Sequence, residues 1–354
     1  MSSTSGAVKH PLAVTTWDTS EYQVGCSILA SGQTTMGPCV AQFEKDFARY
    51  IGTQYAVMVN SGSSANLLMV AAYTLRYGKG TAIVPAVSWA TSYSPFQQYG
   101  WRLKFVDVDD SLCIDPDEAM KAWKEQGGTG EWVVLAVNLL GNCCDFDRLP
   151  GYNWVLEDNC EALGAEYQGR KTGGIGRMGT HSFFFSHHMS TMEGGMITTN
   201  DRTFYEMLLM LRSHGETRRL PAENVFGLTP RPFEFHLPGY NVRPVEIQGA
   251  IGLQQLEKLP AMIEGRRKNA ATCPLPLPRE VGKSSWFGFA TPKTTELLHR
   301  CETRPVVAGN FTKSPSLQFY DYVIQGDLPM ANRVHDEMCY IGNDHRPIDW
   351  ASVL

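Results

Sequence analysis

Residues 55–75, YAVMVNSGSSANLLMVAAYTL, decide the fold class of this chain. The run starts as a short β-rich segment at 55–59, turns through a Gly/Ser stretch, and continues as a helix from about Ser64. Such a turn points backbone N–H groups and hydroxyls at whatever lies above the helix, and the helix dipole favours a phosphate there. A simple N-cap explains this turn equally well when it is taken alone.

The strand–helix alternation continues on both sides of this run. An amphipathic helix is predicted at 40–51, where apolar residues recur at helical spacing and Gly52 follows as a stop. Further helices are predicted at 88–100 and 115–127, the second with an N-cap and an acidic first turn. Strands are predicted at 81–86, 103–109, 132–141, 154–159, 181–186 and 195–201. Several are apolar throughout, as parallel strands covered on both faces are, so the pattern indicates an α/β layered domain.

A long helical pattern at 246–271 closes this layered region. The run TCPLPLPREVG at 272–282 ends the helix, because its prolines cannot continue one. We therefore predict a large domain at 1–271 and a small C-terminal domain at 272–354. The segment at 284–290 and the strand-like segment at 304–309 are assigned to the small domain.

Composition excludes some classes of partner. The 354 residues are 43% hydrophobic and 19% charged, with a net charge of -5 and neither a basic stretch nor a basic tail, which argues against nucleic acid or an anionic membrane. No apolar run approaches the roughly 20 residues of a membrane span. The N-terminus lacks the pattern of a secretory signal. Nine scattered cysteines without framework spacing indicate reduced thiols, so we expect a cytoplasmic protein.

Two polar features follow predicted strands. Glu157 and Asp158 end the strand at 154–159, where open α/β sheets bind ligands; Asp158 is expected to reach into a cleft and Glu157 to be a solvated strand end. Trp89 follows another strand and could stack on a planar ring, although a core role is the commoner one for a single tryptophan. A phosphate cradle, an aromatic lid and a carboxylate meet the needs of a pyridoxal-type cofactor, whose ring nitrogen is kept protonated. No lysine lies in a comparable strand–loop segment to hold its aldehyde.

Nine segments together resemble one family. In order and spacing they are similar to the sugar aminotransferases of the DegT/DnrJ/EryC1/StrS group, which are pyridoxal phosphate (PLP) enzymes. The resemblance implies fold type I, like aspartate aminotransferase, with a large mixed-sheet α/β domain and a small C-terminal domain. The segments are TMGPCVAQFEKDFARYIG, SGSSANLL, PAVSWATSY, VNLLGN, EDNCEALGA, SFFFSHHMSTMEGGMITTND, RSHG, LPGYNVRPVEIQGAIGLQQL and RPVVAGNF.

The chain departs from the family pattern at one decisive position. The family has a lysine six residues before its Glu-Gly-Gly, and here His187 stands six residues before Glu193. This replacement, with SHHMSTMEGG, EDNCEALGA and SSWFGF, resembles the 3-dehydratases of nucleotide-linked 4-keto-6-deoxyhexoses. One branch of that subgroup carries an iron–sulfur cluster. The cysteines after His187, at 273, 301 and 339, lie tens of residues apart, so the chain resembles the cluster-free branch and no metal is expected.

The resemblance also implies a chemistry. Without the lysine, the cofactor would work as pyridoxamine phosphate (PMP), held non-covalently and regenerated by L-glutamate. Its amine would condense with the C4 ketone of the sugar, a base would take a proton from C4′, and the C3 hydroxyl would leave. The product would be a 4-keto-3,6-dideoxy sugar, with loss of ammonia. A neutral imidazole with a pKa near 6.5 suits that base, so we assign it to His187 and expect His188 to face away; a packed role for the pair ranks second and a metal site a distant third.

Further roles are carried over by position. Gly62, Ser63 and Ser182 would bind the cofactor phosphate, Trp89 would stack on the ring and Asp158 would pair with its nitrogen. Asn241 would reach the phosphate of the partner subunit's cofactor, which implies a homodimer. Glu161 stands where the family often has Gln or His near the ring, and its role is open. His214 and Arg304 are candidates for the substrate or the glutamate carboxylate, although His214 fits a helix end before Gly215 nearly as well.

Two other functions stay open. One is a 4-aminotransferase with the same cofactor, against which the missing lysine speaks. The other is a catalytically inactive sugar-nucleotide-binding protein, which only the shortened stretches at 270–284 and 290–303 favour. The sequence fixes neither nucleotide nor hexose; a GDP-4-keto-6-deoxymannose is the first expectation and a CDP-glucose derivative the second.

Overall fold

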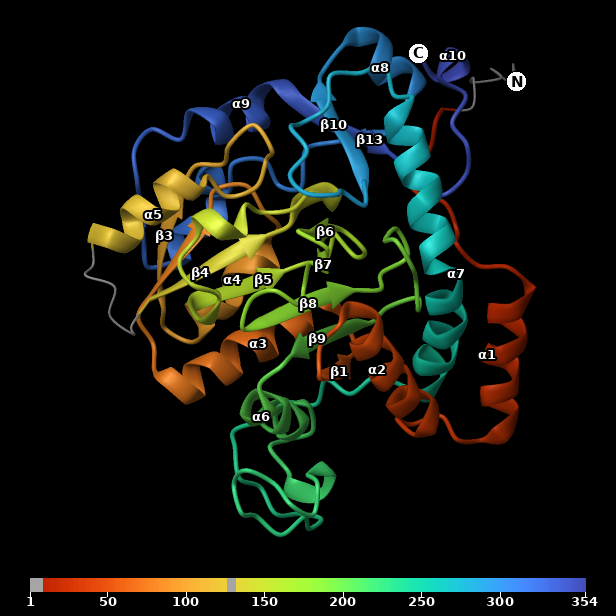
Figure 1. The fold of residues 1–354 in the computed structure, drawn as a ribbon, viewed down its shortest axis with the longest axis vertical. Helices are drawn as coiled ribbons and strands as arrows, with labels where there is room; N and C mark the ends of the chain where they lie inside the picture. Colours follow the sequence, from red (N-terminus) through yellow and green to blue (C-terminus); the bar gives the residue numbers. More distant parts are fainter. Residues whose placement is uncertain (1–8, 126–131) are drawn as a thin grey trace.

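The computed structural model describes residues 9–125 and 132–354, which fold around a large mixed sheet and a small sheet (Figure 1). In these ranges the large sheet has eight strands in the order β1-β9-β8-β5-β4-β2-β3-β12. All neighbours from β8 to β12 are parallel, whereas β9 is antiparallel to both β8 and β1. The strands are β1 Tyr55–Val59, β2 Thr81–Pro85, β3 Arg102–Val106, β4 Trp132–Val137, β5 Val155–Asp158, β8 Met178–Ser182, β9 Gly195–Thr199 and β12 Tyr322–Ile324.

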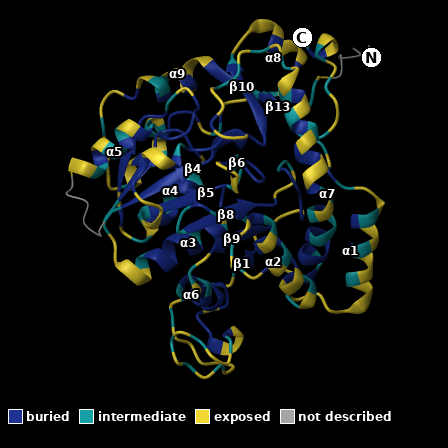
Figure 2. Cartoon of the chain, in the orientation of Figure 1, coloured by how far each residue is buried: buried dark blue, intermediate teal, exposed yellow. Residues whose placement is uncertain are grey.

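Helices pack against this sheet, and its strands are largely buried apart from the exposed edge strand β12 (Figure 2). α3 packs on β8 and β9, α4 and α5 on β3, and α6 on β1. α2 and α1 lie against the long helix α7. The helices are α1 Thr19–Ser31, α2 Pro38–Ile51, α3 Gly62–Tyr77, α4 Ala90–Gln98, α5 Pro116–Glu125, α6 Arg202–Arg212, α7 Glu246–Ala271, α8 Thr295–Arg300, α9 Pro329–Glu337 and α10 Trp350–Val353.

Most predicted elements are confirmed to within a few residues. The strand at 55–59 and the helix at 246–271 have their predicted bounds as β1 and α7. α2 ends at Gly52, whose φ of 89° gives the left-handed stop that glycine adopts without strain. The side chain of Asp115 accepts the backbone N–H groups of residues 117 and 118 at the start of α5, as an N-cap does. Residues 126 and 127 of that predicted helix lie outside the described residues.

Two strand predictions for the large sheet are wrong in part. β8 ends at Ser182, so residues 183–186 are not a strand. Their backbone groups are used inside a loop, in which Phe183 N donates to Gly194 O and Thr191 N donates to Phe183 O, both at 2.9 Å. β4 likewise ends at Val137, because the chain turns through 139–141 with Leu140 at a φ of 49°.

The C-terminal segment contributes strands to both sheets. β10 Gly288–Pro292, β13 Met338–Gly342 and β11 Thr303–Arg304 form the small antiparallel sheet. The predicted strand at 304–309 is wrong beyond its first residue, since Gly309 N donates to Val306 O in a turn. β12 then returns to pair with β3 in the large sheet. The proposed boundary at 272 stays a prediction.

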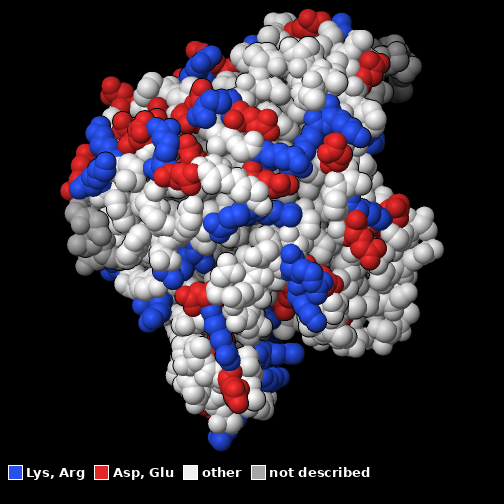
Figure 3. Space-filling model, in the orientation of Figure 1, with Lys and Arg blue, Asp and Glu red and all other residues white. Residues whose placement is uncertain are grey.

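Charged side chains of both signs share the surface. On the face drawn in Figure 3, basic and acidic side chains are interspersed, in keeping with the small net charge. In the described ranges, no helix is long and apolar enough to cross a membrane.

Cys273, Cys301 and Cys339 pack into one apolar cluster with residues of the small sheet, although they are far apart in sequence. No group of three or more metal-binding side chains gathers within the described residues.

Candidate active site

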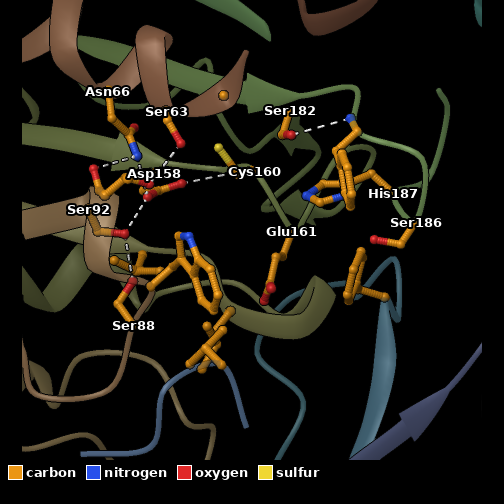
Figure 4. Close-up of a pocket in the computed structure, with 18 of the residues that line it drawn as sticks. Ser63, Asn66, Ser88, Ser92, Asp158, Cys160, Glu161, Ser182, Ser186 and His187 are labelled. Atoms are coloured by element: carbon orange, nitrogen blue, oxygen red, sulfur yellow. Dashed lines mark hydrogen bonds between the residues drawn. The ribbon is translucent and has the colours of Figure 1, made fainter. Parts of the chain in front are cut away.

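A cavity of about 310 Å³ lies where the carboxyl ends of β2, β4, β5 and β8 face the small sheet. Figure 4 shows Asp158 at one end, His187 at the other and Glu161 between them. In the described part of the chain, no lysine lines this cavity. The predicted residues that it brings together are Gly62, Ser63, Trp89, Asp158, Glu161, Ser182, His187 and Arg304.

Asp158 ends β5 with its carboxylate held by polar neighbours. One oxygen accepts Asn66 Nδ2–H at 2.8 Å and Ser92 Oγ–H at 2.7 Å, and the other accepts the backbone N–H of Cys160 at 3.2 Å. Ser92 is itself bonded to Ser88 at 2.7 Å. This network fixes the side chain in one orientation, so a negative charge is placed at the inner end of the cavity.

Glu157 corrects a prediction. It is fully buried rather than a solvated strand end. Successive side chains of a strand point to opposite faces, so Glu157 turns away from the cavity that Asp158 lines. There it accepts the backbone N–H groups of Gly173, Ile175 and Gly176 at 2.6–2.7 Å. Burial raises the pKa of this carboxyl, while these hydrogen bonds lower it, and its role is to anchor the 173–176 turn.

Gly62 brings the N-terminus of α3 against the end of β8. A Cβ at this position would lie 2.7 Å from the Cβ of Ser182 and 3.0 Å from the Sγ of Cys160, so only glycine permits the approach. Ser61 caps the helix by accepting the N–H of Ser64 at 3.0 Å, and Ser63 Oγ donates to Thr91 Oγ1 at 3.0 Å. A helix N-terminus and the hydroxyls of Ser63 and Ser182 thus share one wall of the cavity, as an anion site requires.

Trp89 stands directly before α4 and lines the same cavity. Its side chain is 58% exposed in the single chain, which rules out the alternative of a core residue. Phe184, also half exposed, lines the cavity too. Aromatic rings therefore flank the opening, where a flat ring could be stacked.

Glu161 lies between the two ends of the site and close to the small sheet. Its Oε2 accepts the backbone N–H of Leu140 at 3.2 Å, which the left-handed turn at 139–141 presents. Burial, with the nearby Asp158 charge, raises the pKa of Glu161 to about 7. Tyr340 of β13 lines the cavity next to it, and burial and the Glu161 charge raise the pKa of its phenol.

His187 is carried by the loop that replaces the predicted strand. Its ring packs edge-on against Phe287, with the ring centroids 5.1 Å apart. Its Nδ1 is buried without a hydrogen-bond partner among the described residues. Burial, aided by the Arg266 charge, lowers its pKa to about 3, below the ordinary value near 6.5. The imidazole is consequently neutral throughout the physiological range.

His188 faces away from the cavity, as predicted. Its Nε2 lies 3.2 Å from Ser285 O, to which it donates, and the ring is fully buried. Burial lowers its pKa well below the usual value. His188 therefore ties the loop to the segment that leads into β10.

Two predicted site residues lie elsewhere in the chain. His214 and Asn241 are exposed and do not line the cavity; they sit where the chain leaves α6 and where it approaches α7. Residues 213 and 241 are paired by a backbone bridge. Arg304 does reach the cavity, from β11. Whether His214 and Asn241 act on another subunit's site remains a prediction.

The residues present fit PLP or PMP. The carboxylate of Asp158 matches a ring nitrogen that must stay protonated, and the α3 N-terminus with its hydroxyls matches a phosphate. The missing Cβ of Gly62 lets this helix end stand directly beside β8. His187 presents a neutral imidazole at the far end, where a lysine amine would otherwise be expected.

Sequence reasoning missed several residues of the cavity. Asn66 and Ser92, which orient Asp158, lie one or two turns inside helices, and nothing in sequence spacing links them to β5. Phe287 lies in the SSWFGF segment that carried the subgroup resemblance, and that was the available signal. Tyr340 comes from a strand near the C-terminus that was not predicted.

Comparison with known proteins settles the family. The profile of the DegT/DnrJ/EryC1/StrS aminotransferase family matches residues 17–284. The chain belongs to this family.

Relatives within the DegT/DnrJ/EryC1/StrS family are similar over almost the whole chain. GDP-4-keto-6-deoxy-D-mannose 3-dehydratase of Yersinia pseudotuberculosis is 45% identical, covering 95% of this chain and 94% of the relative. A crystal structure of GDP-4-keto-6-deoxymannose-3-dehydratase with a trapped PLP–glutamate geminal diamine superposes with a TM-score of 0.89 at 42% identity, covering 97% of this chain and 98% of that chain. The Escherichia coli enzyme with bound hydrated PLP gives 0.89 at 41% identity, covering 98% and 97%. These matches confirm the expected fold type I architecture.

Proposed function

We propose that this protein is a GDP-4-keto-6-deoxymannose 3-dehydratase that uses PLP in its PMP form. The observation that carries this is His187, which stands in a cavity with Asp158 and in the position of the family lysine. The three similar proteins named above support the same activity at 41–45% identity. L-Glutamate is the amino donor, and the product is a 4-keto-3,6-dideoxy sugar.

Separate groups of residues would bind the ring and the phosphate of the cofactor. Asp158, oriented by Asn66 and Ser92, would hold the cofactor ring nitrogen in its protonated form. The α3 N-terminus at Gly62, with Ser63 and Ser182, would hold the phosphate. When bound, PMP supplies an amine for the sugar C4 ketone and a ring that delocalises the electron pair left at C4′.

His187 would move the proton. Because its imidazole is neutral, His187 would be able to take a proton from C4′ without first losing one to solvent. The Phe287 ring covers one side of the imidazole, which limits competing protonation there. His187 has no amine that could form a covalent bond to the cofactor aldehyde. The site therefore lacks the lysine that transamination normally uses.

A homodimer would complete the site. Trp89 is left 58% exposed at the opening, and Phe233, on the segment that projects beyond α6 in Figure 1, is 80% exposed. Asn241 is exposed between this projection and α7 and does not line the cavity of its own chain. A second copy would cover these rings and bring Asn241 of the partner subunit to the phosphate. Sedimentation at the protein concentrations of the activity assay tests this proposal. A monomer that binds PMP with full occupancy would refute it.

Direct assay tests the activity. The purified protein, PLP, L-glutamate and GDP-4-keto-6-deoxymannose should yield 2-oxoglutarate, ammonia and a sugar nucleotide that has lost one oxygen atom. Accumulation of an amino sugar without ammonia would instead indicate a 4-aminotransferase. No turnover despite tight binding of the sugar nucleotide would favour the inactive binding protein.

Two substitutions at one position sharpen this assay. His187→Asn should keep PMP binding and lose about 10²–10⁴-fold in kcat, as expected for removal of a general base. His187→Lys should yield a PLP adduct that borohydride fixes to the protein, whereas the unaltered chain should yield none. A borohydride-fixed adduct in the unaltered chain would mean that another lysine serves, which contradicts the proposal.

A further inference from the structure

The loop at 183–194, which carries His187, is held at Ser190 from two directions. The Nε1–H of Trp17 donates to Ser190 O at 3.0 Å, and the N–H of Ser190 donates to Gln255 Oε1 at 3.1 Å. Ser190 is buried and stands three residues after His187. Both of its backbone groups are thus satisfied by residues far away in sequence, and neither contact is part of the cavity.

The two contacts of Trp17 and Gln255 with Ser190 form a clamp, and Gln255 makes this clamp rigid. It is fully buried on α7, where its Oε1 also accepts Thr16 Oγ1–H at 2.6 Å. Its Nε2 donates to Thr16 O at 3.1 Å and to Glu21 Oε1 at 2.8 Å. Glu21 is buried as well and is paired with Lys258 at 2.7 Å. Because every polar atom of the Gln255 amide is used, the side chain has one orientation.

The same N-terminal segment reaches the small sheet at its other end. His10 N donates to Arg300 O at 2.9 Å, Glu302 N donates to His10 O at 2.8 Å, and His10 Nε2 lies 2.9 Å from Gly342 O. Residues 10–17, which we call the N-terminal strap, therefore connect β11 and β13 with the loop of His187. The small sheet supplies Tyr340 and Arg304 to the opposite wall of the cavity.

We propose that the N-terminal strap, acting through Trp17 and Gln255, positions the His187 loop against the cavity wall that the small sheet forms. Trp17 and Gln255 are positioning residues, since neither touches the cavity. A base must be held close to its productive position relative to the proton that it removes, so loss of one clamp should lower kcat more than substrate affinity. This inference rests on the proposed function for its kinetic part only.

The test compares two tryptophan variants. Trp17→Phe removes the N–H donor to Ser190 but keeps an aromatic ring beside Tyr22, whose centroid is 5.5 Å away. Trp350→Phe is the matched control, because Trp350 is likewise half-buried and donates Nε1–H to one oxygen, that of Thr272 at 3.2 Å, beside the small sheet's outer core. Hydrogen exchange of the 184–192 amides is measured by mass spectrometry in both variants, with kcat, KM, PMP affinity and Tm.

In Trp17→Phe we expect faster exchange at 184–192 and a kcat about five- to tenfold lower, with KM and PMP affinity unchanged. Trp350→Phe should leave both exchange at 184–192 and kcat as they are, with a similar change in Tm. Unchanged exchange in Trp17→Phe, or faster exchange with unchanged kcat, would overturn the proposal. If the unaltered protein does not turn over the sugar nucleotide, the proposed function fails, while exchange still decides whether the strap holds the loop.

Discussion

The imidazole of His187 lies edge-on against the phenyl ring of Phe287, with 5.1 Å between centroids and 68° between planes. Phe287 belongs to the segment entering the small sheet, so one residue from each side of the cavity forms this contact. The contact keeps water from one face of the imidazole. It is thereby part of the burial that lowers the pKa of His187 to about 3.

Opening this contact should raise the pKa of His187. In Phe287→Ala, water reaches the imidazole, and its pKa should move up toward the ordinary 6.5. The acid limb of the kcat–pH profile should move to higher pH accordingly, and NMR titration of the histidine measures the shift directly. Phe289→Ala is the control, because Phe289 is buried in the small core outside the cavity. Each variant should lose about 3–5 kcal/mol of stability, so equal pH profiles for both would contradict the prediction.

A methyl group at residue 62 should weaken cofactor binding. In Gly62→Ala the new Cβ would stand 2.7 Å from Ser182 Cβ, so the α3 N-terminus or β8 must shift. We expect a PMP dissociation constant at least tenfold higher and a stability loss of about 1–3 kcal/mol. Gly25→Ala in α1 is the control, since its Cβ would meet only Ile247 and Ile251 side chains at 3.4 Å or beyond. Titration of cofactor fluorescence measures the affinity; equal PMP affinity in both variants would show that α3 does not hold the phosphate.

Glu161 should make cofactor binding depend on pH near neutrality. Its pKa is raised to about 7 by burial, so the carboxyl passes from neutral to charged as pH rises through 7. The PMP dissociation constant, measured between pH 6 and 8.5, should change with an inflection in that range. Glu161→Gln keeps the shape, removes the titration and should flatten the curve. An inflection that persists in the variant would assign it to another group.

Acid should destabilise the protein through its buried histidines. Burial lowers the pKa of His181 and of His187 to about 3, whereas both rise to their ordinary value of about 6.5 on unfolding. Between these values the unfolded chain binds more protons, so the free energy of unfolding is full above pH 6.5 and falls as pH drops toward 3. Glu161 affects the pH dependence of the free energy of unfolding with the opposite sign. Its pKa is raised in the folded chain, so its contribution to stability is lost as pH rises through 7.

Urea unfolding at pH 7.5, 6.5 and 5.5 measures this dependence. His187→Gln should reduce the slope between pH 6.5 and 5.5 by up to about 1.4 kcal/mol per pH unit, the value for one proton. His299→Gln is the control, because His299 is exposed on α8. A slope unchanged in His187→Gln would mean that this imidazole is already charged in the folded chain.

Local sequence patterns predicted the elements well where local physics controls them. The apolar run of β1, the helical spacing of α2 and α7 and the stop at Gly52 predicted these elements, because burial, helical spacing and caps are local properties. The apolar run at 183–186 misled this reasoning. It reads as a strand, but its hydrogen bonds are made within a loop that buries Phe183 and leaves Phe184 and Phe185 half exposed.

Candidate residues were predictable where a motif fixes their position. Asp158, Gly62 and His187 were found from strand ends and from the family's spacing, and they do share one cavity. Asn66, Ser92 and Tyr340 were not found, because their roles depend on contacts between elements distant in sequence. Glu157 was misjudged for the same reason, since only the folded turn at 173–176 supplies its three N–H donors.

The sequence by itself determined the α/β alternation, the family and the exchange of lysine for His187, since each is a matter of residue type and spacing along the chain. Only the tertiary structure decided how that histidine behaves. Its neutral state comes from burial beside Phe287, and its place comes from the clamp on Ser190 by Trp17 and Gln255. Desolvation and long-range hydrogen bonds are set by which surfaces meet when the chain closes, and neither is encoded at any one stretch of the sequence.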